Sequence, residues 1–427
     1  MQQPHALRDK SRDWKHPTND DSAAGDGPQS VNSADSPKVV AMVGSSDALI
    51  WGLTTEQRLR RSLKNLEIQA VLRAGEPLPT EGTIVLVRAD YAIEDRLITA
   101  LVDHEPGVVL AVAKDGTRER FAVAAHVDAA DAESVAERLA GSRPLTELAL
   151  APNLKVVEPG ELGSTYNQKL RKREVPFVLE VRDESIRAIE NRIFAGAYKG
   201  ITDFVTKYAW PLPARWVTRQ SVRLGLSPNS VTALGLVLVF VTLWLFMQGH
   251  FLTGIAVGWL MTFLDTVDGK LARVTLTSSP WGNVFDHGID LIHPPFWYWA
   301  WWYGLHQTVP EAAAMPMLDV ALWIVLIGYV VGRLEEGLFI KAFQIQMHTW
   351  RPVDSFFRLI TARRNPNMAI LTVAALFGAP AIGFLLIALW TVLSLLFHAV
   401  RITQAFMLHR GGGLKSYLTE PLESEAT

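Results

Sequence analysis

Four aspartates at helical spacing are the residues most suited to chemistry in this chain. Asp265 and Asp268 are three residues apart, and Asp286 and Asp290 are four residues apart. Spacings of three and four place each pair on one face of a helix. A short segment rich in serine, proline and glycine, 278–282, separates the pairs. We therefore expect two antiparallel neighbouring helices whose four carboxylates converge.

The cluster of acids predicts a divalent metal site. Carboxylate oxygens without His or Cys suit hard cations such as Mg²⁺, Mn²⁺ or Ca²⁺. A carboxylate within a membrane is costly unless it is paired or coordinates a cation. Two cations, Mg²⁺ or Mn²⁺, held by Asp265, Asp268, Asp286 and Asp290 could bridge the phosphates of a diphosphate donor. One carboxylate must also accept the proton of the attacking hydroxyl, and we predict Asp290, which lies furthest along the second helix.

Small and basic residues accompany the acids at regular spacing. Gly269 and Ala272 leave room where a nucleotide could approach the backbone, and Arg273 offers a fork of donors for phosphate. A single aspartate in a membrane often serves helix packing. That alternative does not explain four acids with Gly, Ala and Arg at fixed positions between them.

The complete pattern, DxxDGxxAR, eight residues, then GxxxDxxxD, resembles the signature of the CDP-alcohol phosphatidyltransferase family. The resemblance covers roughly residues 195 to 405. It implies six membrane spans, a polar cavity facing the cytoplasm, divalent metal and a homodimer. It also implies that Asp290 is the base and a metal ligand, beside Asp265, Asp268 and Asp286. The residues implied for the CDP site are Gly269, Ala272, Arg273 and Gly282.

A Pro-Asn-x-Val-Thr stretch, also typical of that family, opens the first long apolar run at Pro228 to Thr232. Asn229 could cap the helix there, with Pro228 fixing its first turn. Alternatively, Asn229 and Thr232 could contact the nucleotide. The sequence favours neither reading.

Arginines that follow the acidic motif are candidates for the phosphate of an acceptor. These candidates are Arg333, Arg358, Arg363 and Arg364. They could equally be anchors at the membrane surface, and Arg333 could pair with Glu336. An earlier basic run predicts a solvated face or a membrane-surface contact in preference to a substrate site. Its members are Lys169, Arg171, Lys172 and Arg173.

Six apolar runs predict membrane-spanning helices, each near the roughly 20 residues that a bilayer requires. They are 229–248, 252–270, 286–305, 318–342, 367–381 and 383–402. The turns expected outside, 248–251, 306–317 and 379–383, contain no Lys or Arg, whereas the segments expected inside contain several. This asymmetry predicts a multi-pass protein of the plasma (inner) membrane with both termini in the cytoplasm.

The chain is expected to have several domains. They are a disordered tail (1–36), a soluble α/β domain (37–195), a juxtamembrane amphipathic helix (196–228), an all-α membrane domain (229–405) and a C-terminal tail (406–427). In the α/β domain, strands expected at 39–43, 68–72, 83–87 and 108–112 alternate with helices, which predicts a parallel, Rossmann-like sheet. The charged residues 151–200 are expected to be helical.

A soluble α/β domain followed by such a membrane domain resembles the domain arrangement of one bifunctional family. Its members combine an inositol-phosphate cytidylyltransferase and a di-inositol-phosphate phosphate synthase in one chain. Residues 85–90 resemble the strand of nucleotidyltransferases that ends in a metal-binding Asp, here Asp90. The loop at 42–51 departs from those enzymes, because it has one glycine and no basic residue to wrap phosphates. We therefore predict a degenerate, non-catalytic nucleotidyltransferase-like domain.

Together these features predict a membrane phosphotransferase. It would move a phospho-alcohol from CDP-diacylglycerol or a CDP-polyol to a hydroxyl acceptor, a polyol or polyol phosphate, and release CMP. A cation transporter is disfavoured because the acids lie at the cytoplasmic ends of spans, and a silent membrane scaffold because every acidic position is present. The absence of Cys excludes thiol nucleophiles, and a net charge of -2 gives no support for a nucleic-acid partner.

Overall fold

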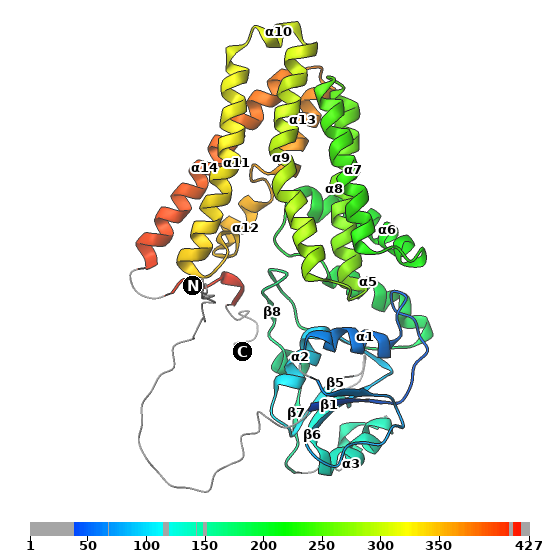
Figure 1. Cartoon of the computed structure of the whole chain (residues 1–427). Helices are drawn as coiled ribbons and strands as arrows, with labels where there is room; N and C mark the ends of the chain where they lie inside the picture. Colours follow the sequence, from blue (N-terminus) through cyan, green and yellow to red (C-terminus); the bar gives the residue numbers. More distant parts are fainter. Residues whose placement is uncertain are drawn as a thin grey trace, which may run out of the picture. The chain divides into compact units, whose positions relative to one another are not determined.

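The computed structural model describes residues 38–66, 68–113, 119–141, 143–147, 152–409 and 413–419. The predicted disordered tail, 1–36, lies outside the described residues, as do 420–427 in the predicted C-terminal tail. An N-terminal α/β region is followed by a region of long helices (Figure 1).

A six-stranded mixed sheet forms the α/β region, in the order β2-β1-β3-β6-β5-β7. Its strands are β1 Lys38–Val43, β2 Ala70–Leu72, β3 Thr83–Arg88, β5 Val108–Ala113, β6 Arg120–Asp128 and β7 Lys155–Val157. Strand β1 runs parallel to β2 and β3, and β5 runs parallel to β7. Strand β6 runs antiparallel to β3 and β5. The sheet is therefore not the parallel sheet predicted, because β6 was not recognised as a strand.

Helices cover both faces of this sheet (Figure 1). They are α1 Thr55–Ser62, α2 Asp95–Asp103 and α3 Ala129–Ala140. Side chains of α1 and α2 pack in one apolar cluster, and those of α3 pack in another on the opposite face. Thr54 and Gln57 form the capping box that begins α1.

The segment between the sheet and the long helices is mostly not helical, contrary to prediction. Short strands β8 Tyr166–Asn167 and β9 Lys172–Arg173 form an antiparallel hairpin. Strand β10 Val178–Glu180 pairs with β4 Tyr91–Ile93. The helical elements are α4 Pro159–Leu162, α5 Ile186–Gly196, a π-helical turn Val205–Ala209 and α6 Pro211–Arg223. Helix α6 thus occupies only part of the predicted juxtamembrane helix, 196–228.

The C-terminal region consists of helices joined by short links. They are α7 Pro228–Met247, α8 Phe251–Val274, α9 Pro280–Thr308, α10 Pro310–Ala313, α11 Pro316–Phe343, α12 Pro352–Arg358, α13 Arg364–Leu376 and α14 Pro380–Leu408. Four described helices, α7, α8, α11 and α14, are long and apolar enough to cross a membrane. Helix α9 is less apolar, and α13, with 13 residues, is shorter than a bilayer requires. The predicted six spans are thus supported for four.

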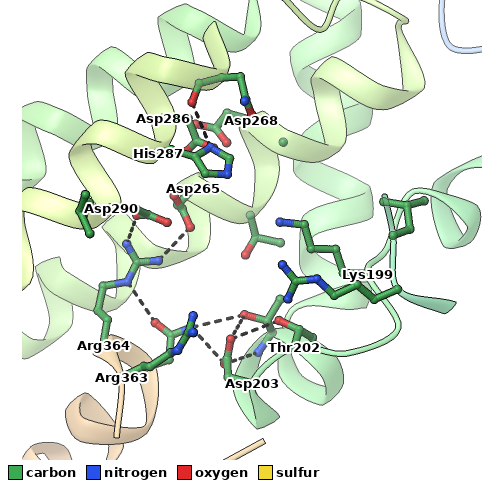
Figure 2. Close-up of a pocket in the computed structure, with 18 of the residues that line it drawn as sticks. Lys199, Thr202, Asp203, Asp265, Asp268, Asp286, His287, Asp290, Arg363 and Arg364 are labelled. Atoms are coloured by element: carbon green, nitrogen blue, oxygen red, sulfur yellow. Dashed lines mark hydrogen bonds and ion pairs between the residues drawn. The ribbon is translucent and has the colours of Figure 1, made fainter. Parts of the chain in front are cut away.

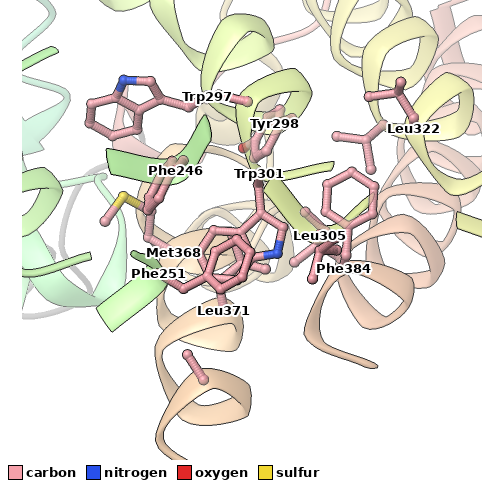
Figure 3. Close-up of a cluster of buried hydrophobic side chains, with 14 of the residues drawn as sticks. Phe246, Phe251, Trp297, Tyr298, Trp301, Leu305, Leu322, Met368, Leu371 and Phe384 are labelled. Atoms are coloured by element: carbon pink, nitrogen blue, oxygen red, sulfur yellow. The ribbon is translucent and has the colours of Figure 1, made fainter. Parts of the chain in front are cut away.

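Aromatic packing fixes α9 against its neighbours. The ring of Trp301 lies 4.9 Å from the ring of Phe246 and 4.5 Å from that of Phe251, between centroids (Figure 3). A Cβ atom at Gly304 would lie 1.9 Å from the carbonyl oxygen of Phe246, so α7 and α9 approach closely only because this residue is glycine. This contact sets the position of the acids at the other end of α9.

Candidate active site

The four acids come together from two adjacent helices. Helix α8 carries Asp265 and Asp268, and α9 carries Asp286 and Asp290. Carboxylate oxygens of Asp265, Asp286 and Asp290 all lie within 4.8 Å of one another. Figure 2 shows these acids gathered on one side of a cavity. The convergence expected from the helical spacing is therefore present.

Asp268 is the most buried of the four acids, with 3% of its surface exposed. Its Oδ2 accepts a hydrogen bond of 2.6 Å from the Thr232 hydroxyl, which joins α7 to α8. Its Oδ1 is buried and has no hydrogen-bond partner among the described residues. A buried carboxylate oxygen without a partner is costly, so this atom is suited to a cation.

Arg364 is the guanidinium in contact with the acids. Its Nη1 donates to Asp290 Oδ1 at 2.5 Å and its Nη2 donates to Asp265 Oδ2 at 2.8 Å. Arg364 was predicted to bind the phosphate of an acceptor, but from the start of α13 it contacts two of the acids instead. Arg364 thus pairs with two of the four carboxylates.

The acid cluster fits a hard divalent cation. Its donors are carboxylate oxygens from Asp265, Asp286 and Asp290, and Asp268, whose Oδ1 has no hydrogen-bond partner among the described residues, lines the same cavity. Mg²⁺ and Mn²⁺ prefer such oxygen ligands.

A cavity of about 910 Å³ opens beside the acids. All six residues predicted for CDP binding line it: Gly269, Ala272, Arg273, Gly282, Asn229 and Thr232. A Cβ atom at Gly282 would lie 2.9 Å from Asn229 Oδ1, so the glycine makes room for the amide. Ser227, not Asn229, caps α7, by accepting a hydrogen bond from the Ser230 amide. Asn229 is therefore available to a ligand.

All four predicted acceptor arginines line the same cavity, and the three other than Arg364 differ in their partners. Arg363 forms an ion pair with Glu336, and Arg333 Nη1 lies 3.5 Å from the same carboxylate, which confirms the pairing anticipated for Arg333. Arg358 is 9% exposed, and its Nε and Nη1 have no hydrogen-bond partner in the described chain. Burial, and then the charge of Arg363, lowers the pKa of Arg358 to about 9.

Sequence reasoning missed cavity residues that precede the long helices. Lys169, Arg171 and Lys199 line the cavity, and Figure 2 shows Lys199 across the space from the acids. Burial, followed by the charges of Arg171 and Arg273, lowers the pKa of Lys199. Lys169 is exposed, as expected for a solvated face, whereas Arg171 is partly buried in the cavity wall. Their charge was visible in the sequence, but the hairpin that places them was not.

The comparisons with known proteins agree with this geometry. The family model for CDP-alcohol phosphatidyltransferase matches residues 226–361, which include all four acids. The C-terminal part of this chain carries a CDP-alcohol phosphatidyltransferase domain.

Several relatives share part of the chain. The bifunctional IPC transferase and DIPP synthase of Rubrobacter xylanophilus is 31% identical over 160 residues, which are 38% of this chain and 33% of that protein. Cholinephosphotransferase 1 of Rattus norvegicus is 29% identical over 122 residues, which are 26% of this chain and 29% of that protein. The chain thus spans about a third of the length of these curated relatives.

A solved structure of the Mycobacterium tuberculosis phosphatidylinositol phosphate synthase with CDP-DAG bound aligns with a TM-score of 0.35 and 21% identity. The alignment covers 44% of this chain and 91% of that chain.

The matched CDP-alcohol phosphatidyltransferase domain does not contain the whole cavity. Arg363 and Arg364 follow the matched residues, whereas Arg171 and Lys199 precede them. The cavity wall is therefore built partly by sequence outside the family domain.

Proposed function

We propose that this protein transfers a phospho-alcohol from a CDP-alcohol donor to a hydroxyl acceptor and releases CMP. The observation that carries the proposal is that four carboxylates of a CDP-alcohol phosphatidyltransferase domain, three of them with oxygens within 4.8 Å of one another, line a cavity of about 910 Å³. A cation transporter has less support, because the acids adjoin a large cavity that the residues predicted for CDP also line.

In this proposal, Asp265, Asp268, Asp286 and Asp290 hold the divalent cations, Mg²⁺ or Mn²⁺. When bound, such ions neutralise charge on the donor diphosphate and on the departing phosphate. Arg273 donates to phosphate oxygens, and Gly269, Ala272 and Gly282 leave space for the nucleotide. Asn229 contacts the nucleotide, and Thr232 holds Asp268 in place through the hydrogen bond described above.

Asp290 acts as the general base as well as a metal ligand. Its carboxylate takes the proton of the acceptor hydroxyl while that oxygen forms a bond to the phosphorus bearing the alcohol. The bond from that phosphorus to the bridging oxygen breaks, and CMP leaves with the electron pair. Arg364 orients Asp290 through the 2.5 Å contact to its Oδ1.

The proposal extends to the cellular setting. The positive residues on the segments expected inside support six spans in the plasma (inner) membrane, with both termini in the cytoplasm. Helices α9 and α13 would complete the bundle with the four candidate spans. The family resemblance implies a homodimer, and the loop at 42–51, which lacks a basic residue, supports a non-catalytic role for the α/β region.

The test is CMP release by the purified full chain in detergent. CDP-diacylglycerol and a CDP-polyol are supplied separately, each with candidate hydroxyl acceptors and with Mg²⁺, Mn²⁺ or EDTA. We expect metal-dependent CMP release with one donor. Cation flux into liposomes containing the protein, with no CMP release from either donor, would support the transporter instead.

The α/β region should not contribute to this chemistry. Both carboxylate oxygens of Asp90 accept hydrogen bonds from Arg88, at 3.0 and 2.6 Å, so the side chain is already neutralised. We expect Asp90→Ala to change the rate of CMP release by less than about twofold, because single distant sites usually act independently. If the wild type makes a CDP-polyol from CTP and a polyol phosphate, and the variant does not, the region is a cytidylyltransferase.

A further inference from the structure

Arg171 holds an unusual backbone conformation at the tip of the β8–β9 hairpin. Its φ is +50°, in the left-handed region that favours glycine. Non-glycine residues keep such conformations only where the surrounding structure enforces them, and they concentrate at ligand sites. Arg171 lines the cavity, so the strained position presents a guanidinium to it.

The hairpin is held in place on both sides. The Gly200 amide donates to the Leu170 carbonyl at 2.8 Å, and a Cβ at Gly200 would lie 2.6 Å from the Arg171 carbonyl oxygen. Lys172 donates to the Gly196 carbonyl at 2.7 Å. Arg173 donates to the Tyr417 carbonyl at 3.0 Å, so the C-terminal segment also packs on the hairpin. Hydrogen bonds from residues on both sides of Arg171 therefore fix its position.

The cavity near Arg171 has more positive charge than its acids neutralise. Glu336 is shared between Arg333 and Arg363. The nine-tenths buried Arg358 has two nitrogens without hydrogen-bond partners in the described chain, and the Nε of Arg171 is also buried without one. Buried guanidinium nitrogens without partners are costly, and an anion that enters the cavity would satisfy them.

Asp203 is a nearby acid whose charge acts on Arg358, so it offsets one positive charge, and its position is fixed by neutral donors. It accepts hydrogen bonds from the Thr206 amide at 3.0 Å and the Asn365 amide group at 3.1 Å. The carboxylates of the acid cluster contact Arg364 instead. Asp203 and Glu336 thus supply two negative charges against the four guanidiniums of Arg171, Arg333, Arg358 and Arg363, which leaves net positive charge in this part of the cavity.

We propose that Arg171 and Arg358 form an anion subsite for a phosphate group of the acceptor. The acceptor would then be a phosphorylated polyol and not a neutral lipid alcohol. The hairpin outside the CDP-alcohol phosphatidyltransferase domain would determine this specificity. The inference rests on the proposed function, of which it specifies the acceptor class.

The test uses Arg171→Gly in the full chain reconstituted in nanodiscs. Glycine removes the guanidinium and relieves the left-handed backbone, so the folded state should not lose thermal stability. We expect the affinity for inorganic phosphate, measured by calorimetry in metal-free buffer, to fall at least about tenfold with the loss of a charge-assisted contact. Affinity for CMP, measured with Mn²⁺, should change less than about threefold.

Two further variants sharpen the test. Arg187→Ala removes one charge from an exposed position on α5 and should leave phosphate affinity unchanged. Gly200→Ala keeps Arg171 but displaces the hairpin, and should weaken phosphate binding in the same direction as Arg171→Gly. Phosphate affinity unchanged in Gly200→Ala would show that the placement of the hairpin does not matter.

The outcomes distinguish a phosphate of the acceptor from a phosphate of the nucleotide donor. Phosphate affinity equal to wild type in Arg171→Gly would overturn the subsite. An equal loss of CMP and phosphate affinity would assign the arginine to the donor and overturn the acceptor assignment. Failure of the proposed function would differ from both, because the wild type would then release no CMP from either donor while phosphate binding remained.

Discussion

Asp290→Asn should reduce CMP release at least about a hundredfold, the usual contribution of a general base. Asparagine retains the shape of the side chain and an oxygen that can accept from Arg364, which lies 2.5 Å from Asp290 Oδ1. It loses the negative charge and the ability to take the acceptor proton. The protein fold should persist, because 40% of the Asp290 side chain is exposed.

The measurement is the rate of CMP release at saturating donor and metal, with CMP affinity determined separately. We expect CMP affinity to stay within about threefold of wild type, since Asp290 is only one of four acids at the site. Asp319→Asn is the matched control, because Asp319 lies on α11, contacts Trp302 and His306, and is 58% exposed. Near-normal turnover in Asp290→Asn would assign the base to another residue.

The acid cluster could be predicted from sequence because its geometry is local. Residues three or four positions apart share a helix face whatever the rest of the fold does. The short link at 278–282 then leaves little choice but an antiparallel pair of helices. The glycines and the arginine predicted for the CDP site lie at fixed positions in the same two helices. The structure places all of them along one cavity.

The sheet was mispredicted for a physical reason. Strand β6, with the sequence RFAVAAHVD, contains three alanines, which have low β propensity, and it gave no clear strand signal. Its pairing with both β3 and β5 depends on residues far apart in sequence. The local sequence pattern does not reveal which distant strands pair. The sheet was therefore predicted to be parallel throughout, although β6 runs antiparallel to both of its neighbours.

Arg171 and Arg364 show the same limitation within the site. Both are basic residues in charged stretches, and charge alone does not reveal which groups they face. Arg364 reaches the acids because α13 packs near α8, and Arg171 reaches the cavity because its hairpin folds against Gly200.

Asp286→Ala should abolish metal-dependent activity by a different route from Asp290→Asn. Asp286 contributes an oxygen within 4.8 Å of those of Asp265 and Asp290, so its removal leaves a hard cation with an incomplete set of oxygens. We expect Mn²⁺ affinity, followed by electron paramagnetic resonance, to fall at least about tenfold. CMP release should fall by about a thousandfold or more, because the diphosphate loses the neutralising charge.

The two aspartate variants separate binding of metal from transfer of the proton. Raising the Mn²⁺ concentration should restore part of the activity of Asp286→Ala, because its defect is one of occupancy. The same increase should not restore Asp290→Asn, whose missing proton acceptor is independent of metal concentration. Identical metal affinity in Asp286→Ala and wild type would place the cation elsewhere and leave the buried, unpartnered oxygen of Asp268 without its proposed ligand.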